Sequence, residues 1–372
     1  YAIMRHDSPK GEASVRFAIR VGVKDEADAE AGAAHFVEHM AFNGSKGIPE
    51  GKLLPMLERL GLAFGADTNA ETGFDQTTYK LDLPNTRAET VDAALMMMRE
   101  VAGNLTISPG AVERERGILL SEASVRNDQN RRRIADFLAA HLPGNRLGPR
   151  ITALPDKIRA ITPGQLKAFY QAHYRPDRAT LVIVGAVDPA DIEAKIRARF
   201  ADWKPAGKAG AEYTGPVTPA QTTRFAAFSD PAIPELIAFD RAMPYEPARN
   251  TLEEDRRGLL ESVAGRIIAN RFQPIALQAD SPVLGAQFAA QDIGRNASLY
   301  GLVVVARDGQ WSRALALGEQ ELRRAYEHGF TPSEVDEAKA NLLAALTNAA
   351  QQAESRRSAG IAGMIVADSL AG

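Results

Sequence analysis

The order of strand-like and helix-like segments limits the fold of this chain more than any other feature of its sequence. Residues 14–21 alternate between apolar and polar side chains, which predicts a half-buried strand. Further strands are expected over 62–70, 74–83 and 179–187, and helices over 30–42, 49–60, 86–101, 162–170 and 189–200. Because strands and helices do not alternate strictly, the pattern favours an α+β fold.

The segment 204–210 is small, polar and contains proline, so it is the best linker candidate in the chain. Beyond it the order of elements restarts, with strands expected over 223–228, 235–242, 284–290 and 298–305 and helices over 252–271, 311–327 and 332–352. A chain of 372 residues exceeds what one hydrophobic core usually organises. We therefore predict two α+β domains, residues 1–203 and 216–372, joined by a linker over 204–215. The similar order hints at a duplicated domain, although no strong sequence repeat accompanies it.

Composition narrows the possible partners and metal ligands. A net charge of -3 gives no electrostatic reason to expect a nucleic acid or a membrane surface as partner. No apolar run reaches the roughly 18 residues that a bilayer span requires, so membrane insertion is not expected. The chain contains no cysteine, and any metal site must therefore use histidine, aspartate and glutamate.

Two of the six histidines, His35 and His39, flank Glu38 within one helical pattern. Residues four apart lie on one face of a helix, so both imidazoles can reach a single ion. Glu38 lies about 60° from His35 around the helix and borders that face. Zinc suits such ligands, lowers the pKa of a water molecule and polarises a carbonyl group. Glu38 is then placed to take the proton of the water and pass it to a leaving amine, which is the H-x-x-E-H arrangement of a metallopeptidase.

The alternative is a solvated helix with two incidental histidines. The neighbouring residues Phe36, Val37 and Met40 argue against it, because they make this helix part of a core. The other four histidines stand alone, without a partner at ligand spacing, and are expected to be structural or exposed.

A third ligand is expected from the helix that begins at Ser108 and whose pattern continues past Arg133 towards Leu142. Its residues Glu115 and Glu122 are seven apart, or two turns, and so point the same way. Apolar residues between them suggest a partly buried face, where carboxylates need a cation or hydrogen bonds. Spacing alone leaves open whether they bind a metal or are surface glutamates.

Several segments are similar to those of one known family. Residues 35–44 resemble the active-site helix of the pitrilysin-like inverzincins, zinc metallopeptidases that include insulysin, the mitochondrial processing peptidase and bacterial periplasmic zinc proteases. Residues 65–70 and 74–79 resemble the strand pair that follows this helix in the family. Residues 113–122 resemble the family's second metal-site helix, and residues 172–176 resemble a helix-to-strand junction. The similarity covers about the first 200 residues well.

The resemblance implies roles for particular residues. Glu122 becomes the third zinc ligand, with one Zn2+ per chain, and Glu115 becomes a carboxylate that orients a histidine ligand. Substrate would bind by strand addition along an exposed sheet edge, at the positions of Asn69 and Ala70. Phe42 would line the pocket beside the scissile bond. The alternative for Asn69 is a turn residue in a loop, and Phe42 could equally be a plain core residue.

The family also implies partners and a location. Its enzymes consist of two halves, each with two similar domains built on a mainly antiparallel sheet, and this chain is expected to form one half. The second half is expected in the same longer chain, in a partner subunit or in a second copy. Tyr1 at the start and an apolar helix-like stretch near the end suggest a processed fragment. A periplasmic location after removal of a leader is expected, with the cytoplasm as the alternative.

These observations predict a zinc-dependent endopeptidase that hydrolyses unfolded peptides or short polypeptides. The alternative function is a non-catalytic or partner-dependent peptide-binding subunit of a two-half peptidase. Such subunits typically lose a ligand or the glutamate of the motif, whereas His35, Glu38, His39 and Glu122 are all present here.

Overall fold

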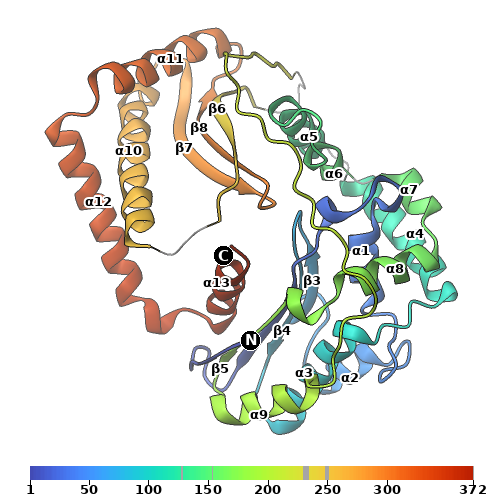
Figure 1. The fold of residues 1–372 in the computed structure, drawn as a ribbon. Helices are drawn as coiled ribbons and strands as arrows, with labels where there is room; N and C mark the ends of the chain where they lie inside the picture. The colour runs from blue at the N-terminus through green and yellow to red at the C-terminus, as the bar shows by residue number, and fades with distance from the viewer. Residues whose placement is uncertain (127–128, 153, 229–233, 248–250, 372) are drawn as a thin grey trace. The chain divides into compact units, whose positions relative to one another are not determined.

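The structure is a computed structural model, and it describes residues 1–126, 129–152, 154–228, 234–247 and 251–371 (Figure 1). The chain forms two compact units, each assembled from separate stretches of sequence. The first unit comprises Tyr1–Asp128, Pro149–Thr214 and Glu354–Gly372, and the second comprises Gln129–Gly148 and Gly215–Ala353. The predicted domains, 1–203 and 216–372, are continuous in sequence, and that division stays a prediction.

A five-stranded sheet organises the first unit, with the strand order β1-β5-β2-β4-β3. Its strands are β1 (Ala2–Arg5), β2 (Ala13–Ile19), β3 (Thr68–Thr72), β4 (Thr77–Leu83) and β5 (Ala179–Gly185). β2 runs antiparallel to both β4 and β5, β3 and β4 form an antiparallel hairpin, and only β1 pairs in parallel, with β5. β3 therefore has one edge that pairs with no other strand of the described chain.

Helices cover one face of this sheet and form the main core with it. They are α1 (Ala33–Met40), α2 (Leu53–Arg59), α3 (Ala88–Gly103), α4 (Pro109–Arg126), α7 (Pro155–Ala160), α8 (Pro163–His173) and α9 (Pro189–Phe200). Phe17 of β2, Tyr79 of β4 and Phe36 of α1 are fully buried between the two layers. Short 3-10 helices lie at Val23–Asp25, Asp28–Glu30, Pro176–Arg178 and Ala353–Ser355, and α6 (Leu147–Ile151) spans the boundary of the units.

The opposite face of the same sheet is covered by α13 (Ser358–Ala371), the last helix of the chain (Figure 1). Ala362 and Val366 of this helix pack against Ala18 of β2 and Val182 of β5. All seven residues of β2 are consequently buried. The expectation of a half-buried strand over 14–21 was wrong, because α13 removes the solvent from its second face.

The second unit contains an antiparallel sheet of order β6-β8-β7, with β6 (Leu236–Pro244), β7 (Val283–Ile293) and β8 (Ala297–Ala306). Its helices are α5 (Gln129–His141), α10 (Leu252–Ala276), α11 (Trp311–His328) and α12 (Pro332–Gln351). Phe272 of α10 is buried against Leu302 and Val304 of β8. His141 at the end of α5 hydrogen-bonds to Asp240 of β6, which joins this helix to the sheet.

The predicted α+β fold class is confirmed, since both units combine sheets with packed helices. The strand expected over 223–228 was wrong: these residues are exposed, pair with no strand of the described chain and leave Phe225 88% exposed. The strand expected over 62–70 begins only at Thr68. The long helix expected after Ser108 is described as two, α4 and α5. None of the described helices has the length and apolar character of a bilayer span.

Candidate metal centre

α1 presents both histidines of the H-x-x-E-H motif on one side. Phe36, Val37 and Met40 turn into the core and are fully buried, which directs His35 and His39 the other way. The two imidazole rings lie 4.7 Å apart between centroids and meet nearly edge to face, at 86°. The i, i+4 spacing therefore brings the rings together as expected.

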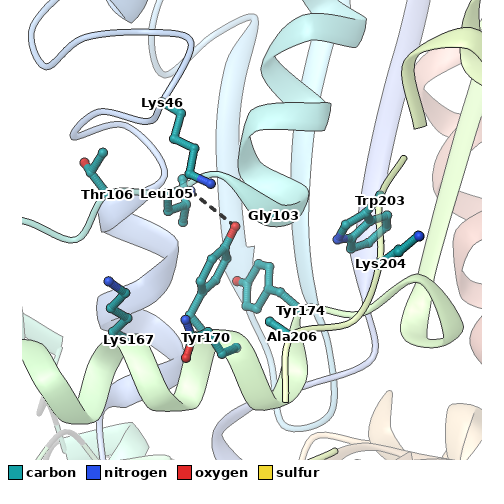
Figure 2. A pocket seen from close by; sticks show the side chains of 11 residues that line it. Lys46, Gly103, Leu105, Thr106, Lys167, Tyr170, Tyr174, Trp203, Lys204 and Ala206 are labelled. Carbon is teal, nitrogen blue, oxygen red and sulfur yellow. Dashed lines mark hydrogen bonds between the residues drawn. The ribbon is translucent and has the colours of Figure 1, made fainter. Parts of the chain in front are cut away.

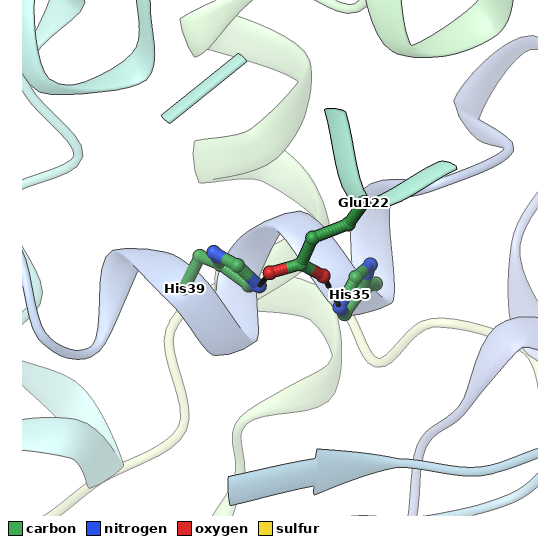
Figure 3. A group of neighbouring side chains, drawn as sticks. All are labelled: His35, His39 and Glu122. Carbon is green, nitrogen blue, oxygen red and sulfur yellow. Dashed lines mark ion pairs between the residues drawn. The ribbon is translucent and has the colours of Figure 1, made fainter. Parts of the chain in front are cut away.

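α4 adds a carboxylate to this pair (Figure 3). One oxygen of Glu122, Oε2, lies 3.6 Å from His35 Nε2, and the other, Oε1, lies 3.8 Å from His39 Nε2. One ligand atom from each of the three residues lies within 4.8 Å of the other two. Among the residues that the structure describes, this is the single group of three or more such side chains that could hold a metal ion.

The donor set fits zinc. In a tetrahedral zinc site with bonds of about 2.0–2.2 Å, neighbouring ligand atoms lie about 3.3–3.6 Å apart. The distance of 3.6 Å from Glu122 Oε2 to His35 lies at the upper end of that range, and the distance of 3.8 Å from Glu122 Oε1 to His39 lies slightly above it. Two imidazoles and one carboxylate also leave a fourth position for water or substrate, as catalytic zinc sites do.

Glu115, two turns before Glu122 on α4, contacts only one of the histidines. Its Oε2 lies 3.0 Å from Nδ1 of His39. Burial opposes ionisation of Glu115, but hydrogen bonds from His39 and Asn43 outweigh it and hold the pKa of Glu115 below its usual value. A carboxylate can only accept, so Nδ1 of His39 donates this hydrogen bond, and in the neutral ring Nε2 then carries the lone pair that a metal ligand needs.

Burial likewise opposes a charged His39, yet the nearby carboxylates of Glu115, Glu122 and Glu38 outweigh it and raise the pKa of His39. Three carboxylates around two imidazoles make the site strongly electronegative. Such a site attracts a cation, which would compensate the charge that the fold brings together.

Glu38 is 8% exposed and lies on α1 between the two histidines. Its Oε2 accepts a hydrogen bond of 2.5 Å from Oγ1 of Thr72, the last residue of β3. Thr72 was not among the residues predicted from the sequence. The period-two alternation of β3 offered a signal, because it places Thr72 on the same face as Ala70, which packs against the helical core.

The predicted substrate-binding residues lie on elements beside α1. Asn69 and Ala70 are inside β3 rather than in a turn, and Asn69 Oδ1 accepts a hydrogen bond of 2.8 Å from the backbone N–H of Ala70. Phe42, directly after α1, meets Phe64 edge to face with 5.4 Å between ring centroids. Phe64 is 55% exposed and was also missed. The substrate roles of Asn69, Ala70 and Phe42 stay predictions.

A separate cavity of about 400 Å³ lies elsewhere in the first unit (Figure 2). Tyr170, Tyr174 and Trp203 line it together with lysines, and the Tyr170 hydroxyl donates to the carbonyl of Val101 at 2.8 Å. None of His35, His39 and Glu122 lines this cavity, so it is distinct from the candidate metal centre.

Comparison with known proteins confirms the resemblance seen in the sequence. A family model described as "Insulinase (Peptidase family M16)" matches residues 1–152. A second model, described as "Peptidase M16 inactive domain", matches residues 160–342. The first match contains all three residues of the candidate metal centre.

Curated relatives are longer than this chain. The "Probable zinc protease PqqL" of Escherichia coli (strain K12) is 30% identical over 365 residues, a match that covers 95% of this chain and 38% of the relative. The "Mitochondrial-processing peptidase subunit beta" of Blastocladiella emersonii is 32% identical over 181 residues, which covers 48% of this chain and 37% of that protein.

Solved structures of peptidases share the fold of this chain. The crystal structure of the periplasmic protease PqqL from Escherichia coli superimposes with a TM-score of 0.90 and 28% identity, over 99% of this chain and 41% of that one. Pitrilysin shares the fold, with a TM-score of 0.69 at 18% identity, over 90% of this chain and 36% of that one. The two family models, the relatives and the shared fold together show that this chain belongs to the insulinase family of peptidases, family M16.

Proposed function

We propose that this chain carries the active site of a zinc-dependent endopeptidase that hydrolyses unfolded peptides or short polypeptides. The observation that supports the proposal most strongly is the meeting of His35, His39 and Glu122 within 4.8 Å, with Glu38 beside them on α1. Two imidazoles and a carboxylate, with a further carboxylate next to them, suit a catalytic zinc site.

His35, His39 and Glu122 would hold one Zn2+, which when bound makes water more acidic and polarises the scissile carbonyl group. Glu38 accepts the proton of the attacking water on its carboxylate and delivers it to the leaving amine. Glu115 accepts the hydrogen bond of His39 Nδ1–H and so keeps Nε2 unprotonated and directed at the centre. Each of these roles is supported by the position of the side chain and by whether it can donate or accept a proton.

The peptide would bind in extended form along the edge of β3 that pairs with no strand of the described chain. Main-chain hydrogen bonds there give affinity with little demand on sequence, which suits an enzyme for unfolded peptides. Asn69 and Ala70 lie within this strand, and Phe42 with Phe64 offers an aromatic surface for one substrate side chain.

The chain spans 38% of the length of its Escherichia coli relative, and a crystal structure of the first half of that protease matches 99% of this chain with a TM-score of 0.89. We therefore infer that a second peptidase half completes the substrate chamber, in the same longer chain, in a partner subunit or in a second copy. The Escherichia coli protease PqqL is a periplasmic protein, which supports a periplasmic location for this protein.

Replacing Glu38 by Gln tests the proposal. Loss of the general base should lower kcat for an unstructured fluorogenic peptide by about 100- to 10,000-fold. Zinc content, measured by atomic absorption, should stay at about one ion per chain. Glu58→Gln, at an exposed position of α2, is the matched control and should leave both values unchanged.

Equal cleavage by Glu38→Gln and the parent would contradict the assigned mechanism. If the parent binds zinc and a labelled peptide in a fluorescence anisotropy assay but cleaves nothing, even with the second half of the enzyme supplied, the protein is a peptide-binding subunit instead.

A further inference from the structure

Thr72 links the edge strand β3 to the candidate general base. It is the last residue of β3, and its hydroxyl oxygen lies 2.5 Å from Glu38 Oε2, 34 positions away in the sequence. β3 packs against α1, so this bond crosses from one element to the other. It connects the strand proposed to hold the peptide with the side chain proposed to move the proton.

The Thr72 hydroxyl has two oxygen neighbours, Glu38 and Thr77, and the direction of its bond to Glu38 follows from the carboxylate. Thr77 faces Thr72 across the β3–β4 hairpin, and its hydroxyl donates to the carbonyl oxygen of Val21 at 3.0 Å. The single proton of Thr77 is thereby committed, and its oxygen lies 3.5 Å from that of Thr72. An ionised carboxylate can only accept, so the Thr72 hydroxyl donates to Glu38.

The surroundings make this hydrogen bond effective. Thr77 is fully buried, Glu38 is 8% exposed and Thr72 is half-buried, so the bond is partly shielded from water. Hydrogen bonds to charged groups are stronger than neutral ones, and a low local dielectric strengthens them further. A Glu side chain has three rotatable bonds, and a fixed donor at one oxygen restricts the rotation of its carboxylate.

We propose that Thr72 is a positioning residue: its hydroxyl fixes the carboxylate of Glu38 and ties its orientation to strand β3. The inference rests on the proposed peptidase function. One strand then aligns the peptide at its open edge and holds the base through the side chain at its end. A peptide that pairs with β3 would reduce the mobility of the strand, and the hydrogen bond from Thr72 would then also reduce the mobility of the Glu38 carboxylate.

Kinetics of three variants test the inference. Thr72→Val removes the hydroxyl at nearly constant volume and should lower kcat by about 10- to 100-fold, with KM changed much less. Thr72→Ser keeps the hydroxyl and should restore kcat to within about threefold of the parent. Thr78→Val is the matched control. Thr78 follows Thr77 in β4 and is 3% exposed, and its hydroxyl makes no hydrogen bond with the described residues.

A second measurement does not depend on activity or on zinc. In metal-free protein, Thr72→Val, Glu38→Ala and the double variant form a double-mutant cycle read by urea denaturation. The midpoint shift of the double variant should be smaller than the sum of the single shifts, whereas Thr78→Val with Glu38→Ala should be additive. Any one of three results overturns the inference. The cycle for Thr72 is additive, Thr72→Val keeps a kcat within twofold of the parent, or Thr72→Ser fails to restore kcat. An inactive parent would count against the proposed function alone, because the cycle still reports on the bond.

Discussion

Glu115 and Glu122 show how two residues of the same type on one helix face acquire different roles. Their separation by two turns predicts that both point the same way, and both do reach His39. Glu122 lies within 3.8 Å of both imidazoles, at their Nε2 atoms. Glu115 instead contacts the far side of the His39 ring, at Nδ1. This geometry supports the proposed roles, Glu122 as a metal ligand and Glu115 as the carboxylate that orients His39.

This difference predicts an order of metal affinities. Glu122→Gln removes a charged ligand and should weaken zinc binding by more than about 100-fold, whereas Glu115→Gln should weaken it by about 10- to 100-fold. Competition with a zinc-binding dye measures both values. Glu113→Gln, an exposed residue of the same helix that pairs with Arg116, is the control and should change nothing. A larger loss for Glu115→Gln would exchange the two assignments.

The sequence predicts the residues of the centre that share a helix more readily than those that meet across elements. His35, Glu38 and His39 follow from helical geometry alone. Thr72 reaches Glu38 from 34 positions away, through the packing of a hairpin on α1. The alternation within β3 places Thr72 on the face that meets the helices, but its contact with Glu38 depends on how the two elements pack together.

At the scale of elements, α1 has an unusual start. Its N-cap is Gly32, which has a φ of +99° and offers no side chain to the first N–H groups. Glu26 supplies the acceptors instead, because its two oxygens accept hydrogen bonds of 2.9 Å from the N–H groups of Gly32 and Ala34. Glu26 is fully buried, and Nε of Arg150 lies 3.5 Å from its carboxylate. The turn that carries His35 is thus anchored from outside the helix.

Removing this anchor should destabilise the metal-free protein. Glu26→Ala leaves two N–H groups without their acceptor and should cost about 2–3 kcal/mol at pH 5 in chemical denaturation. Glu26→Gln keeps one accepting oxygen and should cost less. Glu30→Ala is the control, since the Glu30 side chain makes no hydrogen bond or ion pair with the described residues. Equal stability of Glu26→Ala and the parent would show that the cap is dispensable.

The pH dependence of that loss has a definite sign. Burial raises the pKa of Glu26 to about 7, in spite of the opposing N–H groups and Arg150. A carboxyl group with a raised pKa in the folded state favours folding most below its unfolded pKa, and this contribution declines as the pH rises through 7. The loss on Glu26→Ala should therefore be largest near pH 4.5 and shrink towards pH 8.

Elements with strong end signals were predicted best. The helix expected over 189–200 coincides with α9, because Asp188 caps it and Pro189 occupies its first position. The strand expected over 223–228 failed although its residues suit a strand, because a strand also needs a partner to pair with. Local sequence specifies helix ends well and strand pairing poorly.

At the scale of the whole molecule, the chain enters each unit more than once. The stretch Gln129–Gly148, which contains α5, belongs to the second unit, although the sequence before and after it belongs to the first. α13 returns to the first unit after the whole of the second and buries the remaining face of its sheet. Local patterns cannot predict such returns, since an apolar helix looks the same whichever sheet it covers.

The return of α13 predicts that the last residues of the chain stabilise the unit that holds the metal centre. Val366 is 3% exposed and packs against the sheet, whereas Met364, two residues earlier, is 50% exposed. Val366→Asp would bury an unpaired charge and should cost about 3 kcal/mol or more, which lowers the thermal midpoint of the first unit. Met364→Asp introduces the same charge into solvent and should shift the midpoint by about 1 °C or less. If both variants unfold at the temperature of the parent, α13 does not hold this sheet in solution, and the burial of β2 must have another cause.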